Sequence, residues 1–204
     1  ISNPTEVGTI YSKEELTALS ETCHKYGLYL FLDGARLGYG LAAPDNDLTL
    51  PDIAALCDVF YIGGTKVGAL FGEAVVIRNP ELAQDFRYII KQNGGMLAKG
   101  RLLGLQFDAL FTDGLYQEIS VHAIAMAEKL RGAFTAKGYT YLAPNRTNQI
   151  FVIVPDAHLE KIAEQFEYSY DQRIDATHSC VRFCTGWATK EENVDALIRC
   201  VEKL

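Results

Sequence analysis

Four groups of residues have types and spacings that could carry chemistry: residues 33–36, 63–66, 91–101 and Arg182. Asp33 directly follows an apolar run at residues 28–32 and precedes a glycine. Ligands of open α/β sheets bind where strands end, so a carboxylate at this point could contact a ligand while the glycine allows close backbone approach. The alternative is a structural carboxylate that caps a helix or pairs with Arg36.

Lys66 follows a second apolar run, residues 59–62, through Gly63, Gly64 and Thr65. The Gly-x-x-x-x-Gly-Lys-Ser/Thr pattern is absent, which excludes a P-loop nucleotide site of that type. A lysine with an ordinary pKa of about 10.4 is almost fully protonated at pH 7, so covalent chemistry needs a lowered pKa or capture of the neutral amine as an imine. Lys66 is therefore a candidate Schiff-base lysine, and the alternative is an exposed loop lysine.

Arg182 lies in the otherwise apolar segment Cys180-Val181-Arg182-Phe183-Cys184. A charge inside an apolar strand needs a partner, so we expect Arg182 to bind an anion; the alternative is a surface cation. A small basic cluster consists of Lys91, Lys99 and Arg101. Its members are either solvated helix ends or contacts to a phosphate.

Histidine and cysteine usage gives weaker indications. No two of the four histidines show metal-ligand spacing, so we expect no catalytic metal. His178 is expected in a loop shortly before Arg182, where it could approach the site. The five cysteines are scattered and form no Cys-x-x-Cys pair, which is typical of reduced thiols and favours a cytoplasmic location.

The composition limits the classes of partner. The formal net charge of −7 disfavours nucleic acid or an anionic membrane as the main partner, because phosphate binding needs clustered Lys and Arg. No apolar run approaches the ~20 residues that span a bilayer. The chain starts at Ile1 rather than Met, and we expect that a further segment precedes it.

Helices and strands alternate along the chain, which predicts an α/β fold. A capping box at Ser12 and Glu15 starts a helix that stops at Gly27. Strands are expected at residues 28–32, 59–62, 74–77, 149–154 and 181–184, the first of them covered by helices on both faces. Further helices are expected at residues 80–92, 99–111, 115–137, 157–166 and 191–204. We divide the chain into residues 1–112, with the buried strands, and residues 113–204, a long bridging helix with a small α/β unit.

The order of these motifs resembles the threonine aldolase and β-eliminating lyase family of fold-type-I enzymes, which use pyridoxal 5′-phosphate (PLP). The resemblance covers nearly the whole chain. The matching stretches are Asn-Pro-Thr-Glu-Val-Gly-Thr at 3–9, Leu-Asp-Gly-Ala-Arg-Leu at 32–37, Gly-Gly-Thr-Lys-Val-Gly-Ala at 63–69, Lys-Gln-Asn-Gly-Gly at 91–95, Thr-Asn-Gln-Ile-Phe at 147–151 and Val-Arg-Phe at 181–183. It implies a large domain with a mostly parallel sheet and helices on both faces, of which residues 1–112 are the C-terminal part, and a small C-terminal α/β domain.

The resemblance also implies roles for individual residues. Lys66 would form the Schiff base with PLP, and Asp33 would pair with the protonated pyridine nitrogen, which keeps the ring an electron sink. Arg36 would lie near the phenolate oxygen of the cofactor, and Thr65 would contact its phosphate. Arg182 would bind the α-carboxylate of an amino acid through its planar two-pronged donor.

Further implications concern assembly. Lys99 and Arg101 would contribute to the phosphate site of a neighbouring subunit in a homo-oligomer, either a dimer or a tetramer. The ring-stacking residue and most phosphate contacts would come from sequence before Asn3. We therefore expect the isolated chain to bind PLP poorly.

The implied activity is retro-aldol cleavage of a threonine-like β-hydroxy-α-amino acid to glycine and an aldehyde. His178 or a water molecule is a candidate base. One alternative is a β-eliminating lyase that forms an α-keto acid and ammonia. Another is a catalytically incomplete fragment that acts only in assembly.

Overall fold

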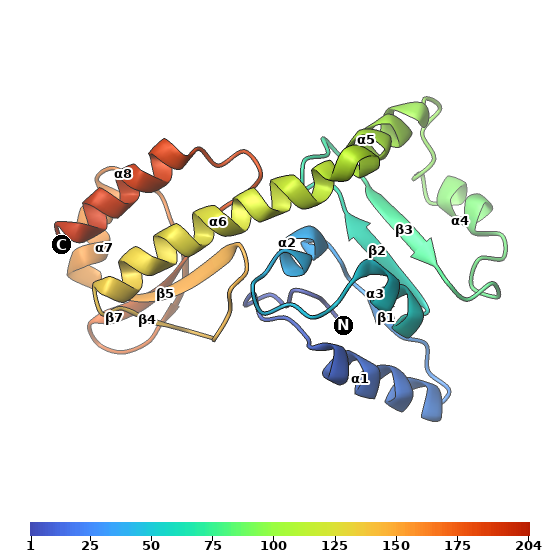
Figure 1. The fold of residues 1–204 in the computed structure, drawn as a ribbon, viewed down its shortest axis with the longest axis horizontal. Helices are drawn as coiled ribbons and strands as arrows, with labels where there is room; N and C mark the ends of the chain where they lie inside the picture. Colours follow the sequence, from blue (N-terminus) through green and yellow to red (C-terminus); the bar gives the residue numbers. More distant parts are fainter.

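Two β-sheets organise the chain, and the long helix α6 (Leu115–Ala136) runs past both of them (Figure 1). The computed structural model describes all residues, 1–204. Helix α6 packs against α2 (Leu37–Leu41) in the first part and against β5 (Gln149–Pro155) and α8 (Glu191–Glu202) in the second. The expected α/β class is confirmed. No helix combines the length and apolar character that crossing a membrane requires.

The first sheet has the strand order β1-β2-β3, with β1 at Phe31–Leu32, β2 at Val59–Gly63 and β3 at Glu73–Ile77. Strands β1 and β2 are parallel, and β2 and β3 are antiparallel. The first residues of the chain run parallel to β1 on its other side. There the Asp33 N–H donates to the Ile1 carbonyl at 2.8 Å and the Asn3 N–H to the Asp33 carbonyl at 3.0 Å. Asp33 is thereby held between two neighbouring segments.

The predicted capping box at Ser12 and Glu15 is confirmed, and it starts α1 (Lys13–Lys25), which ends before Gly27 at a positive φ of 68°. Apolar residues of α1 and α3 (Leu50–Leu56) share one core with the inward-facing residues of β1 and β2. That core also includes residues from α2 and α6. Its strand residues belong to one face of the sheet, for example Leu32, Phe60 and Ile62.

The prediction that residues 28–32 are covered on both faces was wrong. Leu28 and Tyr29 are exposed, and Phe31 keeps 50% of its surface accessible. Alternate side chains of a strand point to opposite faces, so Phe31 lies with Tyr61 and half-exposed Val75 on the face away from the core. The ring centroids of Phe31 and Tyr61 are 6.1 Å apart. Val75 of that face lines a hollow together with Phe86 and Ile90.

Helix α4 also differs from its prediction, since it spans only Phe86–Gln92. Asp85 adopts a left-handed φ of 57°, which interrupts a helix that the sequence places at residues 80–92. Helix α5 occupies Arg101–Phe111 and is followed by the 3-10 turn η1 (Thr112–Gly114). Both helices lie at the far end of the first part (Figure 1).

The second sheet is antiparallel throughout, with the order β4-β5-β7-β6. Strand β4 spans Thr140–Tyr141, β6 Ser169–Arg173 and β7 His178–Cys184. Helix α7 (Asp156–Ala163) and α8 cover one face together with α6, and their apolar residues form a second core. Strand β6 was not predicted, because its sequence Ser-Tyr-Asp-Gln-Arg is exposed along its whole length and has no apolar alternation.

One tyrosine joins α6 to the strand ends of the first sheet. The Tyr116 hydroxyl donates to the Gly63 carbonyl at 2.9 Å and accepts from the Gly38 N–H at 3.0 Å. Tyr116 is buried, so both backbone groups depend on it for their hydrogen bonds. Helix α6 is thereby fixed beside the stretches that carry Asp33 and Lys66.

Candidate active site

The backbones that follow β1 and β2 touch each other, and two glycines make this possible. A Cβ on Gly34 would lie 1.9 Å from the Tyr61 carbonyl oxygen, and one on Gly63 would lie 2.3 Å from the Ala35 carbonyl oxygen. The Gly63 N–H donates to the Gly34 carbonyl at 2.9 Å. This contact brings together the turns that carry Asp33 and Lys66.

Asp33 is half-buried, and its carboxylate accepts a hydrogen bond from the Ala35 N–H at 3.0 Å. Burial alone would raise the pKa of this carboxyl. The Tyr61 hydroxyl, the Ala35 N–H and the positive charges of Lys66 and Arg36 outweigh burial and hold the pKa of Asp33 below its ordinary value. Asp33 therefore caps a turn and also presents a stable negative charge toward Lys66.

Lys66 lies in a turn after β2, and its side chain is exposed. The Tyr39 hydroxyl donates to the Lys66 carbonyl at 2.5 Å and accepts from the Trp187 N–H at 3.3 Å. Tyr39 thus ties the lysine turn to the loop that follows β7. Neighbouring Thr65 is also exposed, and its hydroxyl donates to the Gly72 carbonyl at 3.4 Å.

Arg182 projects from β7 on the side opposite Val181 and Phe183, which belong to the second core. Its Nη1 donates to Gln149 Oε1 at 3.3 Å, and its guanidinium carbon lies 5.9 Å from the Phe151 ring centroid. The Nε atom is buried and has no hydrogen-bond partner within the chain. This Nε–H could donate to an anion only if the anion or the Arg182 side chain moved so that the two came into contact.

Arg36 lies between the two parts. Its side chain is 15% exposed, and Nη1 is 3.8 Å from the Glu6 carboxylate. Burial raises the pKa of the Cys184 thiol, while the charges of Arg182, Arg36 and Lys66 oppose that rise. The charges of residues from both parts of the chain therefore act on this one thiol.

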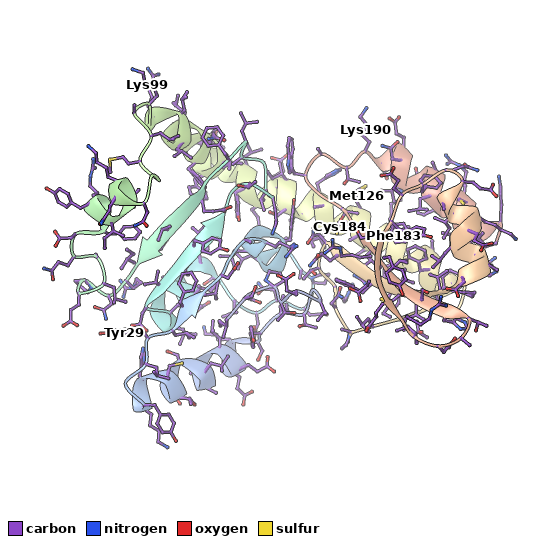
Figure 2. The ribbon with its side chains drawn as sticks, turned by 180° about the vertical axis from the view of Figure 1, so that it is seen from behind. Tyr29, Lys99, Met126, Phe183, Cys184 and Lys190 are labelled. Atoms are coloured by element: carbon purple, nitrogen blue, oxygen red, sulfur yellow. The ribbon has the colours of Figure 1, made fainter.

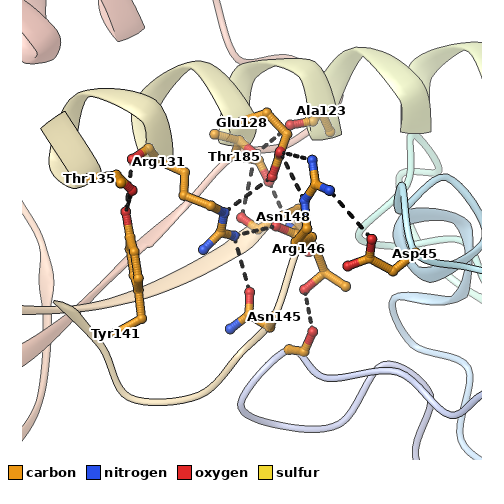
Figure 3. Close-up of polar contacts among 12 residues, drawn as sticks. Asp45, Ala123, Glu128, Arg131, Thr135, Tyr141, Asn145, Arg146, Asn148 and Thr185 are labelled. Atoms are coloured by element: carbon orange, nitrogen blue, oxygen red, sulfur yellow. Dashed lines mark hydrogen bonds and ion pairs between the residues drawn. The ribbon is translucent and has the colours of Figure 1, made fainter.

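A polar network beside this region joins the two parts (Figure 3). Arg146 bonds Glu128 of α6, with Nε 3.1 Å from Oε2, and reaches Asp45 of the first part at 3.4 Å. Asn145 donates to the Val7 carbonyl at 2.7 Å, and Thr147 donates to the Gly8 carbonyl at 2.9 Å. The loop at residues 5–9 is therefore anchored to the start of β5.

Other predicted residues lie elsewhere. His178 begins β7, where its Nδ1 is 3.1 Å from the Asp175 carboxylate. It lies in the strand and not in the expected loop, four residues or about 13 Å from Arg182. Its approach to the site stays a prediction. Lys99 and Arg101 are exposed at the start of α5. Figure 2 shows Lys99 at one end of the molecule and Cys184 near its middle. Their contact to a neighbouring subunit stays a prediction.

Three residues of this region were not predicted from the sequence: Tyr39, Tyr61 and Gln149. Gln149 had a detectable signal, because it is a polar residue at the start of an apolar strand. The tyrosines had none, since each is an ordinary apolar position in its element. A separate hollow of about 480 Å³ between α7 and α8 is lined by Lys161, Arg199 and others, and it includes none of the residues above.

Comparison with known proteins gives a consistent result. The model of the family described as β-eliminating lyase matches residues 1–157. A low specificity L-threonine aldolase of Pseudomonas sp. (strain NCIMB 10558) is 33% identical over 201 residues, which are 97% of this chain and 56% of that protein. The chain thus spans little more than half the length of this curated relative.

Solved structures agree. The structure of Leishmania major threonine aldolase superposes with a TM-score of 0.97 at 43% identity, over 100% of this chain and 59% of that one. A mutant aspartate aminotransferase of Thermus thermophilus complexed with tryptophan has a TM-score of 0.69 at 16% identity, over 100% of this chain and 56% of that one. The second likeness shows a shared fold alone.

The glycine contact gives a sharp test. We expect Gly34→Ala to lower the free energy of unfolding by about 1–3 kcal/mol or more, because the added Cβ would overlap the Tyr61 carbonyl. Gly132→Ala is the matched control. Gly132 is exposed within α6, and a Cβ there meets nothing within 4 Å. Gly132→Ala should therefore raise the free energy of unfolding by about 0.5–1 kcal/mol. Urea unfolding measures both, and a Gly34→Ala protein as stable as the parent would contradict the contact.

Proposed function

The chain belongs to the β-eliminating lyase family, and we propose that it forms the lysine-bearing part of a PLP-dependent lyase. The proposed reaction cleaves the Cα–Cβ bond of a threonine-like β-hydroxy-α-amino acid and releases glycine and an aldehyde. The observation that supports the proposal is that the charge of Lys66 acts both on Asp33 and, together with that of Arg182, on Cys184. The names of the relatives support this choice of substrate.

The residues present fit PLP. Gly34 and Gly63 let the two backbones touch, which brings the Lys66 turn next to Asp33. Asp33 remains ionised at neutral pH, so it would pair with a protonated pyridine nitrogen. Lys66 offers an exposed amine for covalent attachment, Arg36 would lie beside the phenolate oxygen, and Thr65 would donate its hydroxyl to the phosphate. When bound, PLP supplies an electron sink for the bond cleaved at Cα.

Arg182 is proposed to bind the substrate α-carboxylate. Its guanidinium is held by a neutral amide rather than by a carboxylate, so its positive charge is not neutralised within the chain. Arg36 and Lys66 add positive potential in the same region, although Glu6 offsets part of it. A carboxylate bound here would fix the orientation of the amino acid relative to Lys66.

The family description also supports a second candidate, a β-eliminating lyase that releases an α-keto acid and ammonia. Product analysis separates the two reactions, because aldol cleavage yields glycine and an aldehyde. A third possibility is a catalytically incomplete chain that acts only in assembly. A titration of the purified chain with PLP tests it.

The proposal also covers the oligomeric state, the cellular location and the domain boundary of the protein. The protein is proposed to be a cytoplasmic homo-oligomer in which Lys99 and Arg101 contact the phosphate of a neighbouring subunit. The boundary between the PLP-binding domain and the C-terminal unit is placed between residues 112 and 113. The exposed apolar residues of α4 and α5, among them Tyr88 and Leu102, support an assembly contact at that end.

The covalent role of Lys66 can be tested by reduction. Borohydride should fix PLP on Lys66 in the holoenzyme, because reduction converts an imine to a stable amine. Lys66→Ala should abolish the fixed label, whereas the exposed control Lys161→Ala should retain it. Peptide mass spectrometry locates the label, and its presence on a different lysine would refute the assignment.

The role of Arg182 can be tested by equilibrium binding. A hydrogen bond to a charged group contributes about 1.5–3 kcal/mol, so Arg182→Ala should weaken amino-acid binding by roughly 10- to 100-fold. PLP binding should change little, and exposed Arg199→Ala on α8 should leave both affinities unchanged. Parental affinity for amino acids in Arg182→Ala would rule out the carboxylate role.

A further inference from the structure

Gln149 is a fully buried polar residue at the start of β5, directly opposite Cys184 of β7. Both ends of its amide are engaged. Its Oε1 accepts from Arg182 Nη1 at 3.3 Å and lies 3.9 Å from the Cys184 Sγ. Its Nε2 donates to the Glu6 carbonyl at 3.2 Å. The side chain therefore connects the loop at residues 5–9 to the guanidinium of Arg182.

The chemistry of these partners fixes the orientation of the amide. The guanidinium has only donors, so it requires the amide oxygen, and the Glu6 carbonyl has only acceptors, so it requires the amide nitrogen. A reversed amide would place NH2 against the guanidinium and oxygen against oxygen. Only a neutral group with an acceptor at one end and a donor at the other satisfies both sides.

The Glu6 carbonyl is itself held in place. The next two carbonyls of the loop, those of Val7 and Gly8, accept hydrogen bonds from Asn145 and Thr147. The Thr5 and Thr9 hydroxyls bond each other across the base of the loop at 2.6 Å. Gln149 therefore links Arg182 to an anchored segment of the first part, and this link fixes the position of the guanidinium.

We infer that Gln149 is a positioning and selectivity residue for the carboxylate site, an inference that rests on the proposed role of Arg182. It orients the guanidinium without neutralising its charge, which leaves a substrate carboxylate as the counter-ion. A glutamate at this position would supply an internal carboxylate and compete with the substrate. A methionine would fill a similar volume but provide neither the acceptor for Arg182 nor the donor for Glu6.

The test compares two ligands of the holoenzyme: glycine, and methylamine, which has the amine but no carboxylate. Dissociation constants follow from the cofactor absorbance. Gln149→Glu should weaken glycine binding by roughly 10- to 100-fold, because the expected loss of binding free energy is that of a hydrogen bond to a charged group. Gln149→Met should weaken glycine binding by about 3- to 10-fold, which corresponds to the loss of a single ordinary hydrogen bond. The dissociation constant of methylamine should change by less than about twofold in either variant.

Gln165→Glu is the matched control, because it adds the same charge at an exposed position beyond α7 and should leave both affinities unchanged. If Gln149→Glu does not fold, the comparison with Gln149→Met decides. Equal weakening of glycine and methylamine, or no change in glycine binding, would overturn the role of Gln149. If glycine binding in the parent enzyme does not depend on Arg182, the proposed carboxylate site itself fails, whatever the Gln149 variants do.

Discussion

Two stretches of backbone meet where β1 and β2 end, and the candidate site depends on that contact. A Cβ on Gly34 or Gly63 would overlap a backbone oxygen of the neighbouring stretch. The contact places the Asp33 carboxylate where the charge of Lys66 lowers its pKa. Tyr116 then fixes helix α6 to the same strand end, and Tyr39 connects the Lys66 turn to the loop after β7. The two parts of the molecule are therefore joined at the turn that carries the candidate residue Lys66.

The junction also has an uneven distribution of charge. Arg36, Lys66 and Arg182 act on one thiol, that of Cys184, while Asp33 and Glu6 are the carboxylates beside them. Arg182 is bonded to an amide and not to an acid, so part of the positive charge stays available. Such a region favours a small anionic molecule, which agrees with the proposed amino-acid substrate and phosphate-bearing cofactor.

The sequence predicted the parts of the fold that have strong local signals. Helix α1 was predicted from its capping box, and α6 was expected at residues 115–137, close to its observed bounds. Asp33 and Lys66 became candidate site residues because each follows an apolar run. Strand β6 and the break at Asp85 could not be found, because one has no apolar pattern and the other depends on a single left-handed residue. The partners Tyr61 and Gln149 come from other strands, so their contacts depend on tertiary pairing that spacing does not encode.

The central claim is that Asp33 acts as a permanent negative charge for a cofactor attached at Lys66. Asp33→Asn tests it most directly, because asparagine keeps the shape of the side chain and one acceptor oxygen but removes the charge. Cofactor content and the rate of threonine cleavage are measured on the same preparation at neutral pH. We predict that the variant retains PLP on Lys66 and loses turnover by on the order of 100-fold, as expected when a preorganised electrostatic group is removed. Turnover equal to that of the parent enzyme would contradict the account and leave Asp33 only as the acceptor that caps the turn at Ala35.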